Sequence, residues 1–414
     1  MSNKQNVKIA LIDILFFLLI LSTGGLLHQI YGNILSPLFY FVLLIFFAVS
    51  DKKYQKSLIK QTIIIQTFVI IALFCNYYFA PFYNEPVFYI NTYLRLLSTH
   101  IFLFFLLNYN YNVLDQLFRV LKFVALLSLI NFLFSPIFSE LSFLVSTDRI
   151  FIRTLGFIFN YASSFNVLGI DIYRNQGIFW EPGILQIYLN VLFFITTFVR
   201  NSSFYRWLSV FLIISTFSTT GLLLLVIQIL VYYQKKIFQL NLGLKIFILV
   251  FSLPSLIYFL YQNLLDKISG DSVISFDLRL FDLLTAFTYI THFPLSGIGL
   301  DVKNYTDQQS KIAITNMPDF TFDVSSTVGL RGNTNSLLML VVSLGVPIAL
   351  FCIYRLYKQR IINNKKKLFF LIVVISCMSE PLILGNFFML LFLSSSYKFE
   401  YYHVGTDNNR LLVD

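Results

Sequence analysis

Residues 61–80, QTIIIQTFVIIALFCNYYFA, contain no charged side chain and are long enough to cross a lipid bilayer as one helix. The rest of the chain has the same character. Of its 414 residues 57% are hydrophobic and 12% are charged, and the mean hydropathy is +0.76. Soluble domains carry roughly a quarter charged residues. The composition therefore predicts an all-α integral membrane protein and excludes a soluble enzyme, a secreted scaffold and a disordered chain.

Apolar runs of similar length recur on both sides of this segment. They cover residues 9–27, 34–50, 93–109, 118–138, 177–199, 245–262 and 336–354. Each run is close to the length that one membrane-spanning helix needs. They predict a polytopic protein in which residues 1–414 form a single membrane domain.

Two further apolar regions, 207–233 and 368–397, have basic residues at both ends and a polar interruption in the middle. The interruptions are Ser218–Gly221 and Ser379–Pro381. The positive-inside rule places both ends of each region on one face, so each region predicts two short passes. With these passes the chain has about twelve transmembrane helices by the length criterion. A re-entrant hairpin is the alternative for each region.

The basic residues lie in short clusters between apolar runs, although the formal net charge is +10. Such clusters indicate topology rather than a nucleic-acid surface, so no nucleic-acid partner is expected. They place both termini in the cytoplasm and leave two long periplasmic segments, 139–176 and 263–335, on the outer face. Long translocated segments tolerate basic residues, which accounts for those that these two segments carry.

The stretch YRNQGIFWEPG, residues 173–183, concentrates charge at the outer start of a span. Pro182 suits the first turn of a helix, which makes Glu181 the residue near its cap. An outward helix N-terminus offers free N–H groups and partial positive charge, and Arg174 adds a guanidinium just upstream. The stretch predicts an anion site of the pyrophosphate type. The alternative is that Arg174 reaches lipid head groups and Glu181 only caps the helix.

Residues 275–291 mix apolar and polar side chains with helical spacing, which predicts an amphipathic helix on the outer membrane surface. Arg279 on this helix is a candidate second cation, although it is also spaced to pair with Asp282. His292 follows in THFPLSGIG, residues 291–299. Its ordinary pKa of about 6.5 suits a general base, while a structural role beside the turn is the alternative.

A third stretch, GLRGNTNS at residues 329–336, returns the chain to the membrane. Asn335 can cap the following helix, and Arg331 stands just before it. This helix also starts outside, so Arg331 and Asn335 are candidates for binding an anion or a sugar. Arg95 and Glu380, with Asn386, are candidates to line the same cavity, because ionisable groups at membrane depth usually face the interior of a bundle. Arg95 is equally placed to reach the interface.

At these stretches the sequence resembles the bacterial O-antigen polymerase and O-antigen ligase family. The matching positions are Arg174, Gly177, Phe179, Glu181–Gly183, 216–221, Arg279, 292–299, Asn335–Leu338 and Gly345. They occur in one order between about residues 170 and 390, while the first 140 residues match only as generic spans.

The resemblance implies a C-type glycosyltransferase fold, with a lipid-linked donor and neither metal nor cofactor. It implies polymerisation of undecaprenyl-pyrophosphate-linked oligosaccharide repeat units at the periplasmic face of the bacterial inner membrane. Arg174 and Arg279 would hold the pyrophosphate, and Glu181 or His292 would take the proton of the acceptor hydroxyl. A chain-length-regulating co-polymerase is a further partner that the family implies.

Two alternatives accompany the polymerase. A ligase would transfer the finished glycan to lipid A core or to protein, but ligases usually have a His immediately before the Asn that opens the late span. Here Thr334 precedes Asn335, which favours the polymerase branch. A flippase for lipid-linked oligosaccharides would be expected to have matching halves with broken helices, and no such correspondence is seen between 1–200 and 201–414.

Overall fold

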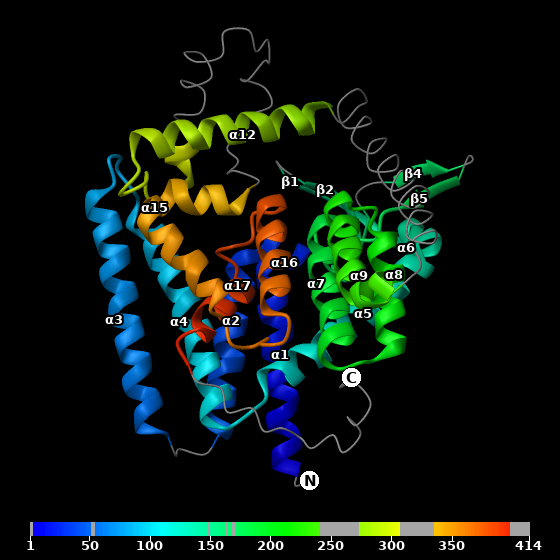
Figure 1. Ribbon diagram of the computed structural model, residues 1–414, viewed down its shortest axis with the longest axis horizontal. Helices are drawn as coiled ribbons and strands as arrows, with labels where there is room; N and C mark the ends of the chain where they lie inside the picture. Colours follow the sequence, from blue (N-terminus) through cyan, green and yellow to red (C-terminus); the bar gives the residue numbers. More distant parts are fainter. Residues whose placement is uncertain are drawn as a thin grey trace.

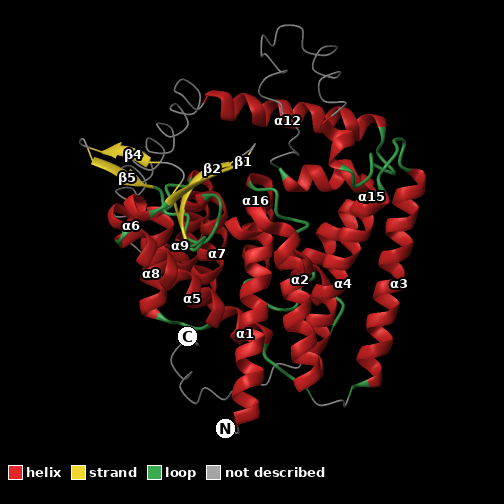
Figure 2. Cartoon of the chain, turned by 180° about the vertical axis from the view of Figure 1, so that it is seen from behind, coloured by secondary structure: helices red, strands yellow, loops and turns green. Residues whose placement is uncertain are grey.

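The computed structural model describes residues 3–50, 54–147, 150–161, 164–167, 170–239, 273–306 and 335–397. In these ranges the chain is mostly helical, with two small antiparallel sheets beside one end of the helical bundle (Figures 1 and 2). The helices are α1 (Asn3–Gly24), α2 (Leu26–Val49), α3 (Lys56–Phe79), α4 (Pro86–Asn108), α5 (Val113–Leu133), α6 (Ser135–Leu141), α7 (Pro182–Phe194), α8 (Ser203–Ser215), α9 (Thr219–Gln239), α12 (Val273–His292), α15 (Ser336–Tyr357), α16 (Lys366–Ser379) and α17 (Asn386–Ser394). A π-helical turn, η1 (Ile195–Val199), continues α7.

Several of the described helices are membrane spans by length and composition. Five pass this test: Val7–Gly24 of α1, all of α3, α4 and α15, and α7 with η1. The number rises to seven if the two halves of α2, and α5 with α6, each count as one bent span. The prediction of a polytopic helical membrane protein is thereby confirmed in its coarse form. The total of twelve stays a prediction, and the run at 245–262 lies outside the described residues.

Helix ends fall at both polar interruptions. Helix α8 ends at Ser215 and α9 begins at Thr219, so the break lies about two residues before the interruption named from sequence. Phe217 takes a left-handed conformation there (φ 48°). Helix α16 ends at Ser379, and α17 begins only at Asn386. Each region therefore contains two helices rather than one long span, and of these α8, α16 and α17 have 13, 14 and 9 residues while α9 has 21.

The first outer segment contains strands, which the all-α prediction missed. Strands β1 (Phe143–Thr147), β2 (Ile150–Leu155) and β3 (Phe159–Tyr161) form one antiparallel sheet, and β4 (Ser164–Val167) pairs with β5 (Ile170–Tyr173). These strands are three to six residues long. The residues of β1 and β2 do not alternate between apolar and polar, and the alternation in β4 (SFNV) and β5 (IDIY) covers only four residues each, too few to identify a strand from sequence. The side chain of Asn160 donates to the carbonyl of Phe179 at 3.2 Å, so the sheet is tied to the chain that leads into α7.

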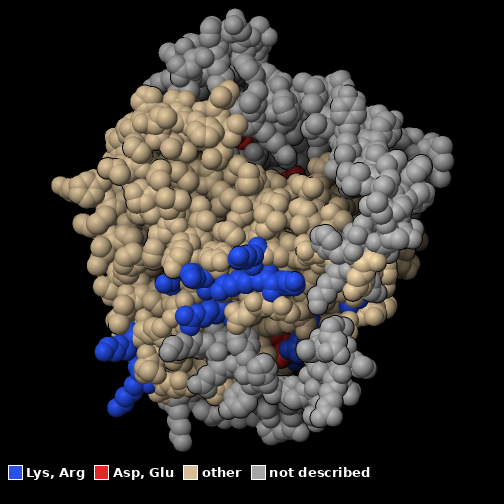
Figure 3. Space-filling view, in the orientation of Figure 1, with Lys and Arg blue, Asp and Glu red and all other residues tan. Residues whose placement is uncertain are grey.

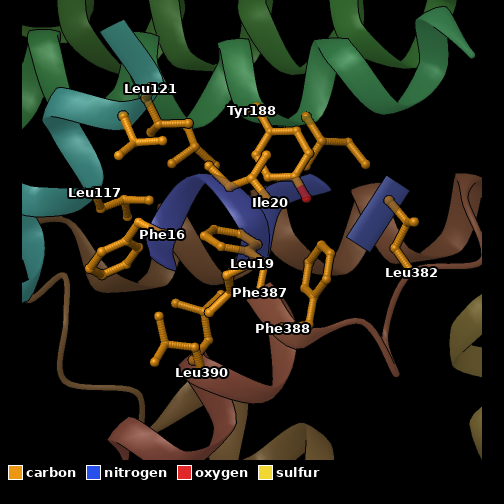
Figure 4. Close-up of a cluster of buried hydrophobic side chains, with 14 of the residues drawn as sticks. Phe16, Leu19, Ile20, Leu117, Leu121, Tyr188, Leu382, Phe387, Phe388 and Leu390 are labelled. Carbon is orange, nitrogen blue, oxygen red and sulfur yellow. The ribbon is translucent and has the colours of Figure 1, made fainter. Parts of the chain in front are cut away.

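Helix α7 lies at the centre of the packing. Every residue from Pro182 to Phe194 is buried. Figure 4 shows side chains of α1, α5, α7 and α17 meeting in this core. Tyr188 stacks on Phe179 with ring centroids 4.9 Å apart and meets Phe387 edge-on at 5.4 Å. A helix that is buried on all sides can hold its first turn in a fixed position.

Helix α12 lies across one end of the bundle, as both ribbon views show (Figures 1 and 2). In its second half Asp282, Thr285, Ala286 and Tyr289 are buried. Their spacing of three and four residues marks one face of a helix, and Phe287 on another face is exposed. A helix therefore covers the predicted segment 275–291, while its amphipathic character and its contact with a membrane surface stay predictions.

Helix α15 bends beneath α12 at Gly345 (φ 77°), two residues before Pro347. Pro347 has no N–H, so the carbonyl of Ser343 loses its helical donor. That carbonyl accepts instead from the backbone N–H of Gly299 and from the side chain of Asn76, both at 3.1 Å. The loop after α12 therefore supplies the hydrogen bonds that the bend removes, as backbone at membrane depth requires.

Gly297 gives a test of this contact. It has a left-handed backbone (φ 65°), and a methyl group there would overlap the carbonyl oxygen of Val342 and lie 2.6 Å from the nitrogen of Gly345. Gly156 has nearly the same φ (63°) but open space around it. We expect Gly156→Ala to cost about 1–2 kcal/mol from backbone strain alone. Gly297→Ala should lower the free energy of unfolding by about 1–3 kcal/mol more than Gly156→Ala does, because the added methyl group overlaps backbone atoms of α15.

The measurement is the thermal unfolding midpoint of both purified variants in one detergent. Equal shifts for the two substitutions would contradict the close contact between the loop and the bend.

Candidate functional site

The candidate site is built around the first turn of α7, at the end of the bundle that α12 crosses (Figure 1). Glu181 is the residue before the helix (φ −145°), and Pro182 is its first residue, as the sequence predicted. The carboxylate of Glu181 makes no capping hydrogen bond to the helix. It is therefore not committed to the capping role that was the alternative reading of this residue.

Glu380 brings a second carboxylate to the same turn. Its side chain is 5% exposed and lies directly against Gly183, where a methyl group would overlap its Oε1 atom. The same methyl group would lie 3.7 Å from Oε1 of Glu181. Gly183 thus leaves the space that brings the two carboxylates together. The partial positive charge of a helix N-terminus favours them there.

Arg174 is held beside these carboxylates by the break between α8 and α9. Its Nε donates to the carbonyl of Thr216 at 3.2 Å, and its Nη2 donates to the carbonyl of Phe217 at 3.3 Å. Carbonyls at a helix C-terminus lack intrahelical donors, so a cation is a natural partner for them. The next residue strengthens the attachment, because the N–H of Asn175 donates to the carbonyl of Ser215 at 3.0 Å.

Arg174 interacts electrostatically with both Glu181 and Glu380. Burial lowers the pKa of the Arg174 guanidinium, and its interactions with Glu181 and Glu380 raise that pKa. A guanidinium remains protonated in proteins even so. The site therefore holds one fixed cation and two carboxylates at a buried helix N-terminus. Such a group can bind an anionic oxygen through Arg174 and accept a proton on a carboxylate.

His292 is not brought to this site. It lies in the last turn of α12, is exposed, and its Nδ1 is 2.8 Å from the carbonyl oxygen of Thr288. The neighbouring Phe293 packs on Phe82 in the turn between α3 and α4. Figures 1 and 2 show this end of α12 above α3 and α15, on the opposite side of the bundle from α7. The prediction that His292 shares a site with Arg174 is wrong, because α12 carries it across the bundle.

The other predicted residues have mixed outcomes. Asn335 caps α15, its side-chain oxygen accepting from the N–H groups of Leu337 and Leu338 at 3.1 Å each, as predicted. Arg95 lies against α2, where it interacts electrostatically with His28 and Tyr40.

Ser336 donates to the carbonyl of Cys377 at 2.7 Å, so the start of α15 lies near the end of α16 that leads to Glu380. Arg331 lies outside the described residues. Arg279 lies on α12, but its side chain is likewise outside the described part of the chain.

Several buried amides below the first turn of α7 were missed by the sequence analysis. Asn190 donates to Oε1 of Gln186 at 2.9 Å and accepts from Gln228 at 2.8 Å. Gln176 is fully buried, and neither of its amide atoms has a hydrogen-bond partner within the described residues. The sequence contains a pattern that could have identified Gln186 and Asn190. Amides four residues apart in an otherwise apolar helix lie on one face and usually point into a bundle.

Comparisons of the chain with protein-family models, with curated proteins and with solved structures found no match. The resemblance to the O-antigen polymerase and ligase family stays a prediction from the sequence. The chemistry of the site is therefore inferred from Arg174, Glu181 and Glu380 themselves.

The charge balance of the site predicts how its variants unfold. Arg174→Gln leaves two neighbouring carboxylates without this cation. We expect the free energy of unfolding to fall by about 3 kcal/mol. This is near the lower end of the range for removing a buried charge partner, because Arg174 is half-buried. Adding Glu380→Gln to that variant should recover part of the loss. The measurement is a double-mutant cycle on unfolding free energies or midpoints in detergent.

Arg153→Gln is the matched control, since Arg153 is exposed on β2. It should change stability by no more than about 0.5 kcal/mol. If Arg174→Gln and Arg153→Gln shift the midpoint equally, the three charges are not coupled.

Proposed function

We propose that the chain is a membrane glycosyltransferase that polymerises undecaprenyl-pyrophosphate-linked oligosaccharide repeat units, like the O-antigen polymerases that its sequence resembles. The observation that supports this most is the meeting of Arg174, Glu181 and Glu380 at the first turn of α7. Charges at this depth are costly and usually functional. The distribution of Lys and Arg predicts that this end of the bundle faces the extracytoplasmic side, where lipid-linked repeat units would be polymerised in the proposed pathway.

In the proposed reaction a sugar hydroxyl of one lipid-linked unit attacks the anomeric carbon of another. A bond forms between the acceptor oxygen and that carbon, and the bond from the carbon to the pyrophosphate oxygen breaks. The acceptor proton passes to a carboxylate, and undecaprenyl pyrophosphate leaves with one more negative charge. Arg174 is placed to stabilise this developing charge, with the free N–H groups of the α7 N-terminus beside it.

Glu181 is the better general base of the two carboxylates. Its side chain is partly exposed, so an acceptor hydroxyl can reach it, whereas Glu380 is 5% exposed and packed against Gly183. Glu380 then acts as a positioning residue that holds the charge of Arg174. Arg279 on α12, and Arg331, stay proposed as further cations for the pyrophosphate.

Activity of purified variants tests the assignment. The substrate is a lipid-linked repeat unit in nanodiscs, and the measurement is the rate of formation of dimers and longer chains. Loss of a general base typically costs about 10²–10⁴-fold in rate, so Glu181→Gln should fall in that range. Arg174→Gln should lose roughly 10²–10³-fold, as for removal of one donor to a developing oxyanion.

Glu140→Gln is the matched carboxylate control, because Glu140 is exposed on α6, within the first outer segment. It should retain activity within about twofold, since surface changes away from a site are nearly neutral. Long chains made by Glu181→Gln at the normal rate would overturn the assignment of the base.

Gene deletion in the source bacterium separates the polymerase from the two alternatives. Loss of a polymerase leaves single repeat units on the surface, which a polysaccharide gel resolves from a ladder. Loss of a ligase leaves long chains on the lipid carrier, and loss of a flippase leaves single units at the inner face. Either of the last two results would reject the polymerase.

A further inference from the structure

A long apolar groove opens on the side of the bundle between α3 and α15. The empty space between these helices, counted together with its open side, is about 820 Å³. Helices α3, α4, α15 and α17 contribute its walls, and the lining side chains are nearly all apolar. Phe68 of α3 and Phe351 of α15 meet across it with ring centroids 5.3 Å apart.

The length of the groove fits one hydrocarbon chain of a single bilayer leaflet. Both Leu344 and Leu356 of α15 line it. Twelve residues of helix rise about 18 Å, close to half of a hydrocarbon core about 30 Å thick. A fatty acyl chain has this length, whereas an undecaprenyl chain is several times longer.

Arg355 lies beside two aromatic rings that line the groove. Its guanidinium carbon lies 5.7 Å from the ring centroid of Phe351 and 5.6 Å from that of Phe392, and both rings line the groove. Its Nε is buried and has no hydrogen-bond partner in the described part of the chain. No carboxylate of the described residues forms an ion pair with Arg355. A cation with free hydrogen-bonding capacity therefore lies beside the groove.

Other cations lie near Arg355 and make the local electrostatic potential more positive, which favours binding of an anion. Arg360 lies within electrostatic range of both Arg355 and Lys366, and Lys366 also interacts with Lys358. Figure 3 shows Lys and Arg side chains as a band across this face of the molecule. The simpler explanation is that these basic residues only set the orientation of the chain, with this side in the cytoplasm. That explanation does not account for a half-buried arginine set against the rings of an apolar groove.

We propose that the groove binds one anionic glycerophospholipid, with an acyl chain along α15 and the phosphate on Arg355. The head group then lies at the band of Lys and Arg side chains, and the acyl chain runs from there along α15. A phosphate oxygen accepts from the guanidinium, which is the geometry that arginine favours. This site is separate from the proposed catalytic one, so it does not depend on the reaction assigned above.

The test is native mass spectrometry of the delipidated full-length chain in detergent. Phosphatidylglycerol and phosphatidylcholine with identical acyl chains are added in equal amounts, and the ratio of the two bound lipids is measured. Both lipids carry the phosphate, but the choline cation of phosphatidylcholine would meet the cations around Arg355, so we expect the wild type to prefer phosphatidylglycerol about tenfold. Arg355→Gln should bring the ratio close to one.

Two further variants make the test specific. Lys60→Gln removes an exposed basic residue of α3 that does not line the groove, and it should keep the wild-type ratio. Ala72→Trp fills the groove from α3 and should reduce the binding of both lipids. Circular dichroism and the unfolding midpoint of each variant confirm its fold.

Three results would overturn the proposal. The first is equal binding of the two lipids by the wild type. The second is an equal change of the ratio in Lys60→Gln and Arg355→Gln. The third is unchanged lipid binding in Ala72→Trp.

Discussion

A charge or backbone group inside a hydrocarbon layer must find its partner within the protein, and this requirement governs the parts of the structure that matter most. Where α8 ends, the carbonyls of Thr216 and Phe217 lose their helical donors, and the Arg174 guanidinium binds both. Where α15 bends before Pro347, the loop after α12 donates to the carbonyl of Ser343. In both places a break in one helix fixes the position of a segment distant in sequence.

At the start of α7 this requirement brings three charged side chains together. Because all residues of α7 from Pro182 to Phe194 are buried, its first turn cannot shift without disturbing the core around Tyr188. Gly183 leaves that turn without a side chain, and the Glu380 carboxylate occupies the space. The Arg174 guanidinium interacts with this carboxylate and with that of Glu181. The three charges thus meet at the first turn of a fully buried helix, which suits the proposed chemistry because that chemistry depends on preorganised groups.

Sequence reasoning succeeded where the physics is local. The start of α7 at Glu181–Pro182, the breaks near 218 and 380, and the cap at Asn335 follow from proline geometry, polar interruption and capping chemistry. Sequence reasoning failed where long-range packing determines the position of a residue. The nearness of Glu380 to Gly183 and the distance of His292 from α7 depend on how α16 and α12 lie in the bundle. The strands of the first outer segment are three to six residues long, so the alternation of polar and apolar residues in β4 and β5 is too short to identify a strand.

The two carboxylates beside one guanidinium repel an anionic substrate, and the proposed reaction proceeds without adding to this repulsion. A pyrophosphate bound near Arg174 would face the negative charges of Glu181 and Glu380. During transfer the leaving group gains one negative charge while the acceptor proton neutralises Glu181, so the net charge around Arg174 does not change. In a site of low dielectric constant such a reaction avoids the cost of building up uncompensated charge. The proximity of base and leaving group to the same arginine is then a means of coupling proton transfer to bond cleavage.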